Sequence, residues 1–235
     1  MHEAWYYAAY FVPYIGYWQL LAAVDKYVVY DDVNYIKGGW INRNRTLVNG
    51  KPAYFNLPVI GASSNKLINE VSVNIDSRAI GKCLRGLEAS YRKAPYYEDI
   101  YPILEKILTF QESNLAKFLF NSFVVIMDYL SIRTELIMSS TLKKDNSLRA
   151  QDKVLHICEL LDATEYYNAI GGQELYSFDE FSNRNVNLKF LKTDEISYEQ
   201  FKNDFCPNLS IIDVLMFNSV EKTKDYLTSY SLIER

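Results

Sequence analysis

The chain has 235 residues, of which 49% are hydrophobic, 15% aromatic and 23% charged. This content provides for a sizeable core and excludes a disordered chain, while the formal net charge of −4 argues against general nucleic-acid affinity. The two histidines, His2 and His156, argue against a histidine-based triad or a multi-histidine metal centre.

The three cysteines are odd in number and far apart, at Cys83, Cys158 and Cys206. This pattern predicts buried thiols in a reducing compartment better than a disulfide framework or a zinc site. No signal-peptide pattern is visible, and the longest apolar run, 118–127, is shorter than the roughly 20 residues that span a bilayer. We therefore expect a cytoplasmic protein without a membrane span.

The beginning of the chain has the pattern of a β-α-β unit. An aromatic-rich stretch leads to Gly16, followed by helical apolar spacing over 17–24 and a β-branched, aromatic run at 26–30. That run ends in the acidic pair Asp31 and Asp32. Such units predict a parallel sheet with functional groups at the carboxyl ends of its strands.

The middle of the chain combines a hairpin with helices. Asn49-Gly50 is a strong hairpin signal between two strand-like runs, 46–48 and 53–59, and 67–75 is a further strand candidate. From about 77 to 132 the pattern is helical, with apolar faces of helical period at 78–91, 98–110 and 115–130.

The last third returns to alternation. Strands are predicted at 135–139, 166–169 and 186–191, and helices at 145–161, 210–217 and 220–229. The whole pattern predicts a single α/β domain over 1–235, with a Rossmann-like, mostly parallel sheet and a helical insertion at about 77–132.

The first candidate site contains Tyr14, Gly16 and Tyr17. A glycine at a strand-to-helix turn lets a phosphate or carboxylate approach backbone amides at the positive end of the helix. A tight turn with packed aromatic side chains explains the same pattern.

The second candidate is the pair Asp31 and Asp32, at the end of a predicted strand. Such carboxylates bind sugar hydroxyls, hold Mg²⁺ or act as a catalytic base. A solvated loop is the alternative.

The segment 37–45 is the most informative, because cations, glycines, a tryptophan and amides are concentrated in an otherwise acidic chain. Lys37, Arg43 and Arg45 are suited to a phosphate or carboxylate, and the two arginines share one face of an extended segment. Trp40 offers a plane for a ring and Asn42 a neutral hydrogen-bonding group. A charged surface loop is again the alternative.

Two further segments carry polar groups. Asp145 or Ser147 is expected to cap the helix that follows, and this helix start, with Lys143 and Gln151, also suits an anionic ligand. After a short strand, a Gly-Gly pair permits close backbone approach between neutral hydrogen-bonding groups. The candidates there are Asn168, Gly171, Gly172, Gln173 and Tyr176.

Together these segments resemble the WbqC-like family, bacterial proteins encoded among surface-polysaccharide (O-antigen) genes. The resemblance covers almost the whole chain and rests on 13–18, 28–35, 37–45, 144–148, 168–176 and 207–219. Family members are described as transferases, some of them for glycine. The resemblance therefore implies transfer of an amino-acyl or similar small group to a nucleotide-linked amino sugar. Asp31 or Asp32 is the best candidate for the base that frees the acceptor amine. A non-catalytic protein that binds a nucleotide-sugar or a partner of the same pathway is the alternative.

The chain departs from the family at Tyr7-Ala8-Ala9, where members usually carry His- or Met-Gln-Pro, and at Ala150, where they generally have glycine. The segment order also resembles nucleotidylyltransferase-like enzymes such as pantothenate synthetase. Tyr14 and Tyr17 then replace both histidines of their turn, which makes adenylyl transfer doubtful. No metal-ligand or nicotinamide signature is present, so ATP and Mg²⁺ stay open as cofactors, as does the oligomeric state.

Overall fold

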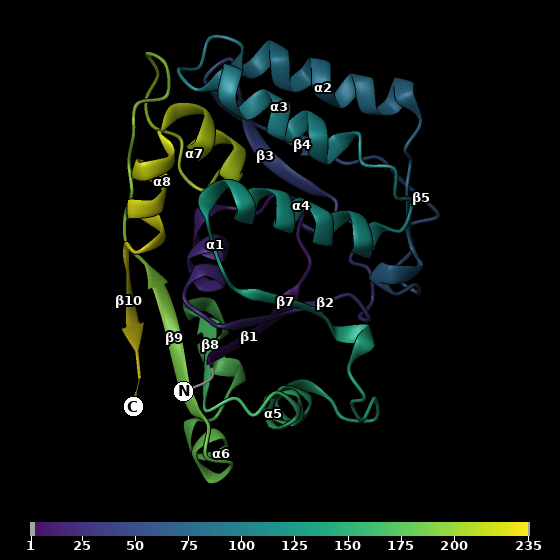
Figure 1. The fold of residues 1–235 in the computed structure, drawn as a ribbon, viewed down its shortest axis with the longest axis vertical. Helices are drawn as coiled ribbons and strands as arrows, with labels where there is room; N and C mark the ends of the chain where they lie inside the picture. Colours follow the sequence, from purple (N-terminus) through teal and green to yellow (C-terminus); the bar gives the residue numbers. More distant parts are fainter. Residues whose placement is uncertain (1–2, 235) are drawn as a thin grey trace.

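A six-stranded sheet forms the centre of the computed structural model, which describes residues 3–234 (Figure 1). His2 lies outside the described residues. In spatial order the strands are β10 (Tyr230–Ile233), β9 (Asn187–Thr193), β8 (Glu165–Ala169), β1 (Glu3–Ala8), β2 (Lys26–Tyr30) and β7 (Glu135–Met138). Neighbours pair in parallel, except that β10 runs antiparallel to β9. The predicted mixed α/β fold with a mostly parallel sheet is confirmed.

Helices cover both faces of this sheet. Trp5 and Tyr27 pack with α1 (Ile15–Ala22) and α4 (Leu115–Leu130), whereas Val28 and Tyr166 pack with α5 (Ala150–Leu160) and α6 (Phe178–Asn183) on the other face. Consecutive side chains of the central strands β2 and β8 are therefore buried, without the alternation of buried and exposed residues, as expected for parallel strands covered on both faces.

A long connection joins β2 to its neighbour β7. It contains β3 (Arg43–Val48), β4 (Lys51–Asn56), β5 (Val59–Ile60), β6 (Ser72–Val73), α2 (Ser77–Tyr91), α3 (Tyr97–Leu108) and α4. The hairpin of β3 and β4 turns at Asn49 and Gly50, whose φ values of 51° and 73° fit the predicted two-residue turn. The three predicted helices are confirmed, and α3 contains Pro102.

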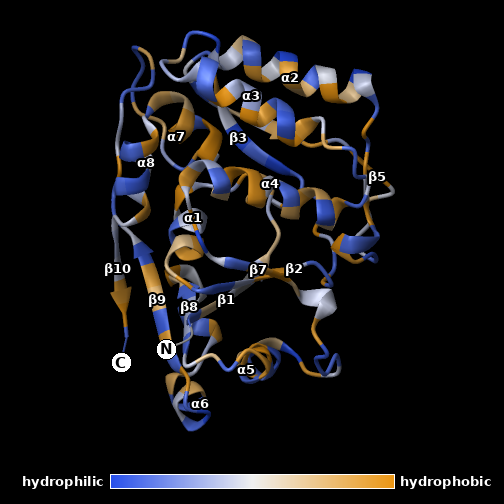
Figure 2. Cartoon of the chain, viewed as in Figure 1, coloured by the Kyte–Doolittle hydropathy of each residue, from blue (hydrophilic) through white to orange (hydrophobic). Residues whose placement is uncertain are grey.

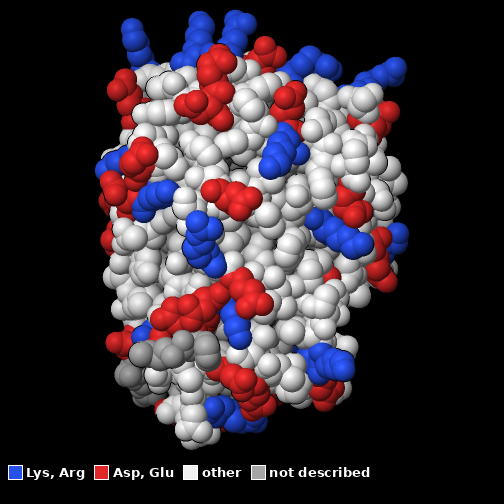
Figure 3. All heavy atoms as spheres, in the orientation of Figure 1, with Lys and Arg blue, Asp and Glu red and all other residues white. Residues whose placement is uncertain are grey.

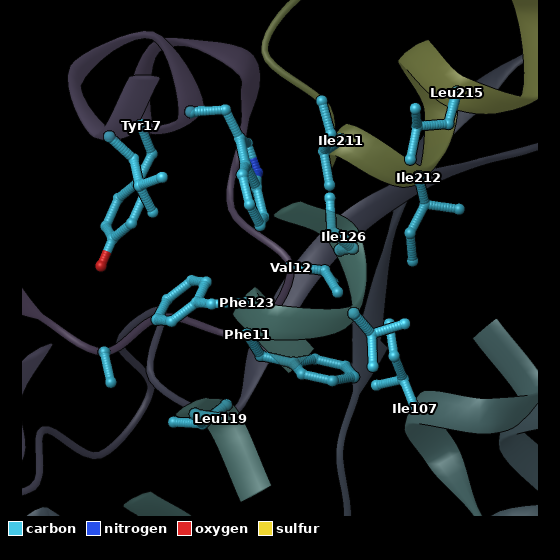
Figure 4. Close-up of a cluster of buried hydrophobic side chains, with 14 of the residues drawn as sticks. Phe11, Val12, Tyr17, Ile107, Leu119, Phe123, Ile126, Ile211, Ile212 and Leu215 are labelled. Carbon is cyan, nitrogen blue, oxygen red and sulfur yellow. The ribbon is translucent and has the colours of Figure 1, made fainter. Parts of the chain in front are cut away.

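The larger core lies between α1, α4 and α7 (Ile211–Phe217) (Figure 4). Phe11 and Val12, from the β1–α1 connection, meet Phe123 and Ile126 of α4 there. All seven residues of α7 are buried, and Figure 2 shows this helix as hydrophobic along almost its whole length. The connection that leads into α1 is thus anchored on a packed core.

The sequence prediction is wrong in several elements. Within 67–75 only the two-residue β6 is a strand. A 3₁₀ turn (Ile68–Glu70) precedes it, because the amides of Glu70 and Val71 bond back to the carbonyl oxygens of Leu67 and Ile68 and not to a neighbouring strand. Helix α5 begins at Ala150, so neither Asp145 nor Ser147 caps it. The last helix, α8 (Val220–Leu227), ends early, and the unpredicted α6 and β10 complete the fold.

The cysteines are free, but only Cys158 is buried; Cys83 and Cys206 are partly exposed, so the prediction of buried thiols is wrong for these two. Within residues 3–234, no helix combines the length and the apolar character that crossing a membrane requires.

Candidate functional site

A cavity of about 1090 Å³ lies at the carboxyl end of the sheet, beside β1, β8 and β9. The chain order of the parallel strands reverses between β1 and β8, and crevices at such points are the usual ligand sites of open α/β sheets. The walls come from the first turn of α1, the 3₁₀ turn Ile170–Leu175, the end of β9 and the segment 194–209. We call this the switch-point cavity.

Ile15 and Gly16, in the first turn of α1, line this cavity. No side chain caps the helix at Tyr14, and the first amides of a helix have no partner within it. A Cβ on Gly16 would lie 2.6 Å from Oγ1 of Thr193 and 2.6 Å from the ring of Tyr14. Only glycine allows this close approach, so the helix start and the end of β9 form one wall that suits an anion.

The connection before α1 is strained and firmly held. Val12 has a φ of 39°, which is rare for a β-branched residue. Nδ2 of Asn44 donates to the carbonyl oxygens of Phe11 and Val12 over 3.1 and 3.0 Å, and Oγ of Ser210 donates to Val12 over 2.6 Å. Strain that the surroundings hold in place is common at ligand sites, where it fixes the geometry in advance.

Neutral hydrogen-bonding groups dominate the polar lining. They are Tyr7, Tyr14, Asn168, Tyr176, Thr193, Ser197, Tyr198 and Asn208. Burial raises the pKa of the Tyr14 and Tyr176 phenols, so both keep their protons at neutral pH. These groups can orient hydroxyl and carbonyl groups of a ligand, but they are poor bases.

The charged lining is Lys192, Asp194 and Glu195, all exposed. None of the three forms an ion pair within the part of the chain that the structure describes. A ligand that enters the cavity therefore meets one unpaired cation and two unpaired carboxylates.

Arg45 lies at the rim. Its Nη2 donates to the carbonyl oxygen of Asn208, a lining residue, over 3.2 Å. Its guanidinium carbon lies 5.7 Å from the ring centroid of Trp40, and that of Arg43 lies 4.3 Å from the ring centroid of Tyr54. The predicted pair of arginines thus forms a cationic and aromatic surface beside the cavity, with both rings partly exposed.

Two residues of the same segment lie apart from this surface. Asn42 accepts from the hydroxyl of Tyr35 over 2.6 Å and donates to the carbonyl oxygen of Leu57, so it holds the loop. Lys37 is exposed and does not line the cavity.

Asp31 and Asp32 lie at the end of β2 and do not line the switch-point cavity. The Asp31 carboxylate accepts from Nδ2 of Asn69 over 3.1 Å and from the amide of Ser140 over 2.9 Å. Nζ of Lys144 lies 2.5 Å from Oδ2 of Asp32, and the Lys144 side chain is only 1% exposed. Both carboxylates therefore bind neighbouring protein groups. We call Asp31 and Asp32, with their partners Asn69, Ser140 and Lys144, the acidic cluster.

The other predicted residues divide between cavity and framework. Tyr14, Gly16, Asn168, Gly171, Gly172 and Tyr176 line the cavity, whereas Lys143, Asp145, Ser147 and Gln173 are exposed elsewhere. Tyr17 is fully buried, and its hydroxyl bonds to the hydroxyl of Tyr27 and to the carbonyl of Ala8. Gln151 accepts from the amide of Ser177 over 2.6 Å, which fixes the residue after Tyr176.

Several residues of the site were not predicted. Thr193 and Tyr198 come from β9 and from the segment after it, where the sequence predicted no candidate residue. Asn44 and Ser210 lie within segments of the family resemblance, between the two arginines and before α7, so the motifs contained a signal for them. Among residues 3–234, no group of three His, Cys, Asp or Glu side chains could hold a metal ion.

Known proteins match this chain along nearly its whole length. An uncharacterised protein of Mycobacterium tuberculosis, Rv1507c, is 28% identical over 220 residues, which cover 92% of this chain and 94% of that protein. No solved structure matches. The model of the WbqC-like protein family matches residues 9–225, a range that includes the whole cavity wall except Tyr7. The chain belongs to the WbqC-like protein family.

Proposed function

We propose that the switch-point cavity binds a nucleotide-linked amino sugar and that the protein transfers an amino-acyl group, such as glycyl, to the sugar amine. The observation that carries this proposal is the cavity against the uncapped start of α1, at the point where the strand order reverses. The resemblance to proteins encoded among surface-polysaccharide genes suggests the substrate class.

The sheet supports a Rossmann-like interpretation of the fold. Numbered along the chain, the parallel strands have the order 3-2-1-4-5, followed by an antiparallel edge strand. This is the order of the doubly wound dinucleotide-binding folds, in which the diphosphate lies at the start of the first helix. By that analogy the diphosphate of a sugar nucleotide binds at Ile15 and Gly16, with Arg45 as a second anion-binding group at the rim.

The remaining wall suits the sugar. Thr193 and the protonated phenols of Tyr14 and Tyr176 orient hydroxyl groups, while Trp40 offers a partly exposed ring for the base. Asn168 is buried and bonds to the amide of Ala169 over 2.7 Å, so it holds this part of the wall. Asp194 and Glu195 replace Asp31 and Asp32 as the proposed bases, because they line the cavity without an ion pair.

The proposed step is an acyl transfer. The donor is an activated acyl compound, a thioester or a mixed anhydride. The sugar amine attacks the donor carbonyl, the new C–N bond forms, and the bond to the thiolate or phosphate leaving group breaks. Asp194 or Glu195 takes the proton that the amine loses.

A second candidate function is ligand binding without turnover. It is favoured by the absence of any histidine or cysteine from the cavity wall within the described residues. It is also favoured by Tyr7, which lines the cavity where family members usually carry a different residue.

A thermal-shift panel separates these functions. The ligands are UDP-N-acetylglucosamine, a dTDP-amino sugar, ATP, glycine and Mg²⁺, alone and in pairs. A ligand at 100 times its dissociation constant stabilises by about 2.7 kcal/mol, which is readily measured. We expect a shift with a sugar nucleotide in the wild type and none in Gly16→Ala, with Gly81→Ala as the matched control. If no sugar nucleotide raises the melting temperature of the wild type or of Gly81→Ala, the proposal is wrong.

Turnover is then tested on the sugar nucleotide that binds. Incubation with glycyl thioester should add the mass of one glycyl group to an amino sugar nucleotide. Saturable binding without this product would favour the non-catalytic function.

A further inference from the structure

A second hollow, of about 1150 Å³, lies outside the switch-point cavity. It is bounded by the β3–β4 turn, the end of α2, the link to α3 and residues 199–203. The segment 194–209 separates the two, because Tyr198 and Phe205 line the switch-point cavity while Phe201 lines the hollow. We call it the α2 hollow.

The rim of the α2 hollow is cationic. Arg92, Lys93 and Lys202 contribute to its lining, against the single carboxylate of Glu199. Within residues 3–234 none of these three cations forms an ion pair. Lys and Arg side chains also project along the edge of the molecule where α2 lies (Figure 3). In a chain with a formal net charge of −4, this concentration of unpaired cations favours an anionic occupant.

The interior of the hollow is apolar and open. Pro95 and Phe201 expose apolar surface beside the buried Leu47 and Phe217, and α2 contributes only the small residues Gly86, Ala89 and Ser90. A Cβ on Gly86 would meet no atom within 4 Å. The space is therefore not filled by the protein's own side chains.

The wall shared with the switch-point cavity is fixed by a buried carboxylate. Asp213 is fully buried, and its oxygens accept from Nε2 of Gln200 over 2.6 Å, from the hydroxyl of Tyr198 over 2.9 Å and from that of Tyr91 over 2.8 Å. Tyr91 belongs to α2 and also accepts from the amide of Leu47 over 2.8 Å. These bonds tie the hairpin, α2 and 198–200 together, so the hollow is formed before a ligand arrives.

We propose that the α2 hollow is a second ligand site, for an amphipathic organic anion with an apolar body and one phosphate, sulfonate or carboxylate. The apolar floor removes the body from water, and the rim cations Arg92, Lys93 and Lys202 bind the anion. This site is separate from the switch-point cavity and does not depend on what that cavity binds.

The test is fluorescence titration of the full chain with anilinonaphthalene sulfonate, which combines aromatic rings with one anion. We expect saturable binding that falls at least tenfold in Gly86→Leu and stays unchanged in Gly81→Leu, the same replacement earlier in α2. Leucine should not lower the melting temperature, because the Gly86 position is open and leucine is a better helix former than glycine.

A charge pair completes the test. Lys93→Glu with Lys202→Glu should weaken binding at least tenfold, whereas Lys82→Glu with Lys106→Glu, equal in net charge and outside the hollow, should not. Decyl phosphate and AMP are then tested as competitors of the probe. The one that displaces it at the lower concentration shows whether the site prefers an alkyl or a nucleoside body. Decanol and inorganic phosphate, which each lack half of the ligand, should not displace the probe.

Three results would overturn the proposal: no saturable binding by the wild type, equal binding by folded Gly86→Leu, or displacement by inorganic phosphate alone. Because Gly16→Ala changes only the switch-point cavity, it should keep its affinity for the probe. Loss of probe binding in folded Gly16→Ala would place the probe in that cavity and reject the α2 hollow.

Discussion

The carboxyl end of the sheet carries two polar regions with opposite properties, the switch-point cavity and the acidic cluster. In the cavity, Asp194 and Glu195 are exposed without ion pairs, and the helix start at Gly16 has no cap. In the acidic cluster, Asp31 accepts two hydrogen bonds from neighbouring loops. Asp32 pairs through Oδ2 with buried Lys144, and only its buried Oδ1 has no hydrogen-bond partner among the described residues. Polar groups that already bond to the protein stabilise the fold, whereas polar groups without a protein partner at the wall of a cavity can bind a ligand.

The sequence could not distinguish these regions. Both follow a strand of one sheet, and both combine acidic or polar residues with nearby cations. The difference depends on partners distant in the chain, Asn69 and Lys144 for the acidic cluster and Thr193 for Gly16. The comparison predicts that changes in the acidic cluster alter stability, whereas changes at the cavity alter ligand binding.

Alkaline pH should produce the largest effect, because tyrosines pack beside the cavity. Burial raises the pKa of Tyr17 and Tyr27 well above 10, their usual value. Their contribution to stability is therefore complete below pH 10 and is lost as the pH rises toward their folded-state pKa. Each of the two tyrosines should lower the free energy of unfolding by roughly 1 kcal/mol per pH unit above 10. Urea unfolding from pH 7 to 11.5 measures this loss; a free energy independent of pH above 10 would contradict it.

Lys144→Met should destabilise the protein strongly. It leaves the Asp32 carboxylate without its cation in a largely buried position, which costs about 3 kcal/mol. Urea unfolding at neutral pH measures the loss, and Lys143→Met is the control, because that lysine is exposed. Affinity for a sugar nucleotide should be unchanged in the folded variant. A stable variant that has lost binding would instead make the acidic cluster the ligand site.

Gly16→Ala should affect both stability and binding. The added methyl group overlaps Thr193 and Tyr14, and overpacking of this kind costs about 1–3 kcal/mol. It also moves the wall where the anion is proposed to bind, so sugar-nucleotide affinity should fall beyond detection by calorimetry. Gly81→Ala, in a helix away from the cavity, should be neutral or stabilising. Unchanged affinity in Gly16→Ala would remove the helix start from the site.

Tyr14→Phe should have the smallest effect and the most selective one. The Tyr14 side chain is 38% exposed, and the change removes only a hydroxyl that faces the cavity. Loss of one neutral hydrogen bond to the ligand costs about 1 kcal/mol, or roughly fivefold in affinity. The melting temperature should stay the same. An affinity equal to that of the wild type would exclude this hydroxyl from ligand contact.

Local patterns predicted much of the fold. The β-α-β unit, the Asn49-Gly50 hairpin and helices α2 to α4 follow from hydrophobic period and turn chemistry, which act over short distances. The start of α5 and the edge strand β10 were missed. Residues Asp145 and Ser147 bond to each other instead of capping the helix, and β10 depends on its pairing with β9.

The site was predicted only in part. Gly16 and the Gly171-Gly172 pair, which line the cavity, were singled out because glycine at the end of a strand indicates close backbone approach. Thr193 was missed because its role depends on contact with Gly16, which lies far away in the sequence. Arg45 was recognised as a cation, but its position at the rim depends on Asn208, which the sequence did not single out.

We propose that the switch-point cavity, and not the acidic cluster, is the ligand site. Hydrogen–deuterium exchange with and without UDP-glucosamine, which carries a free amine, distinguishes the two regions, because each yields separate peptides. We expect slower exchange in 7–16, 168–176 and 192–198, with 31–33 and 139–153 unchanged. Protection confined to 31–33 and 139–153, or none at saturating ligand, would contradict it.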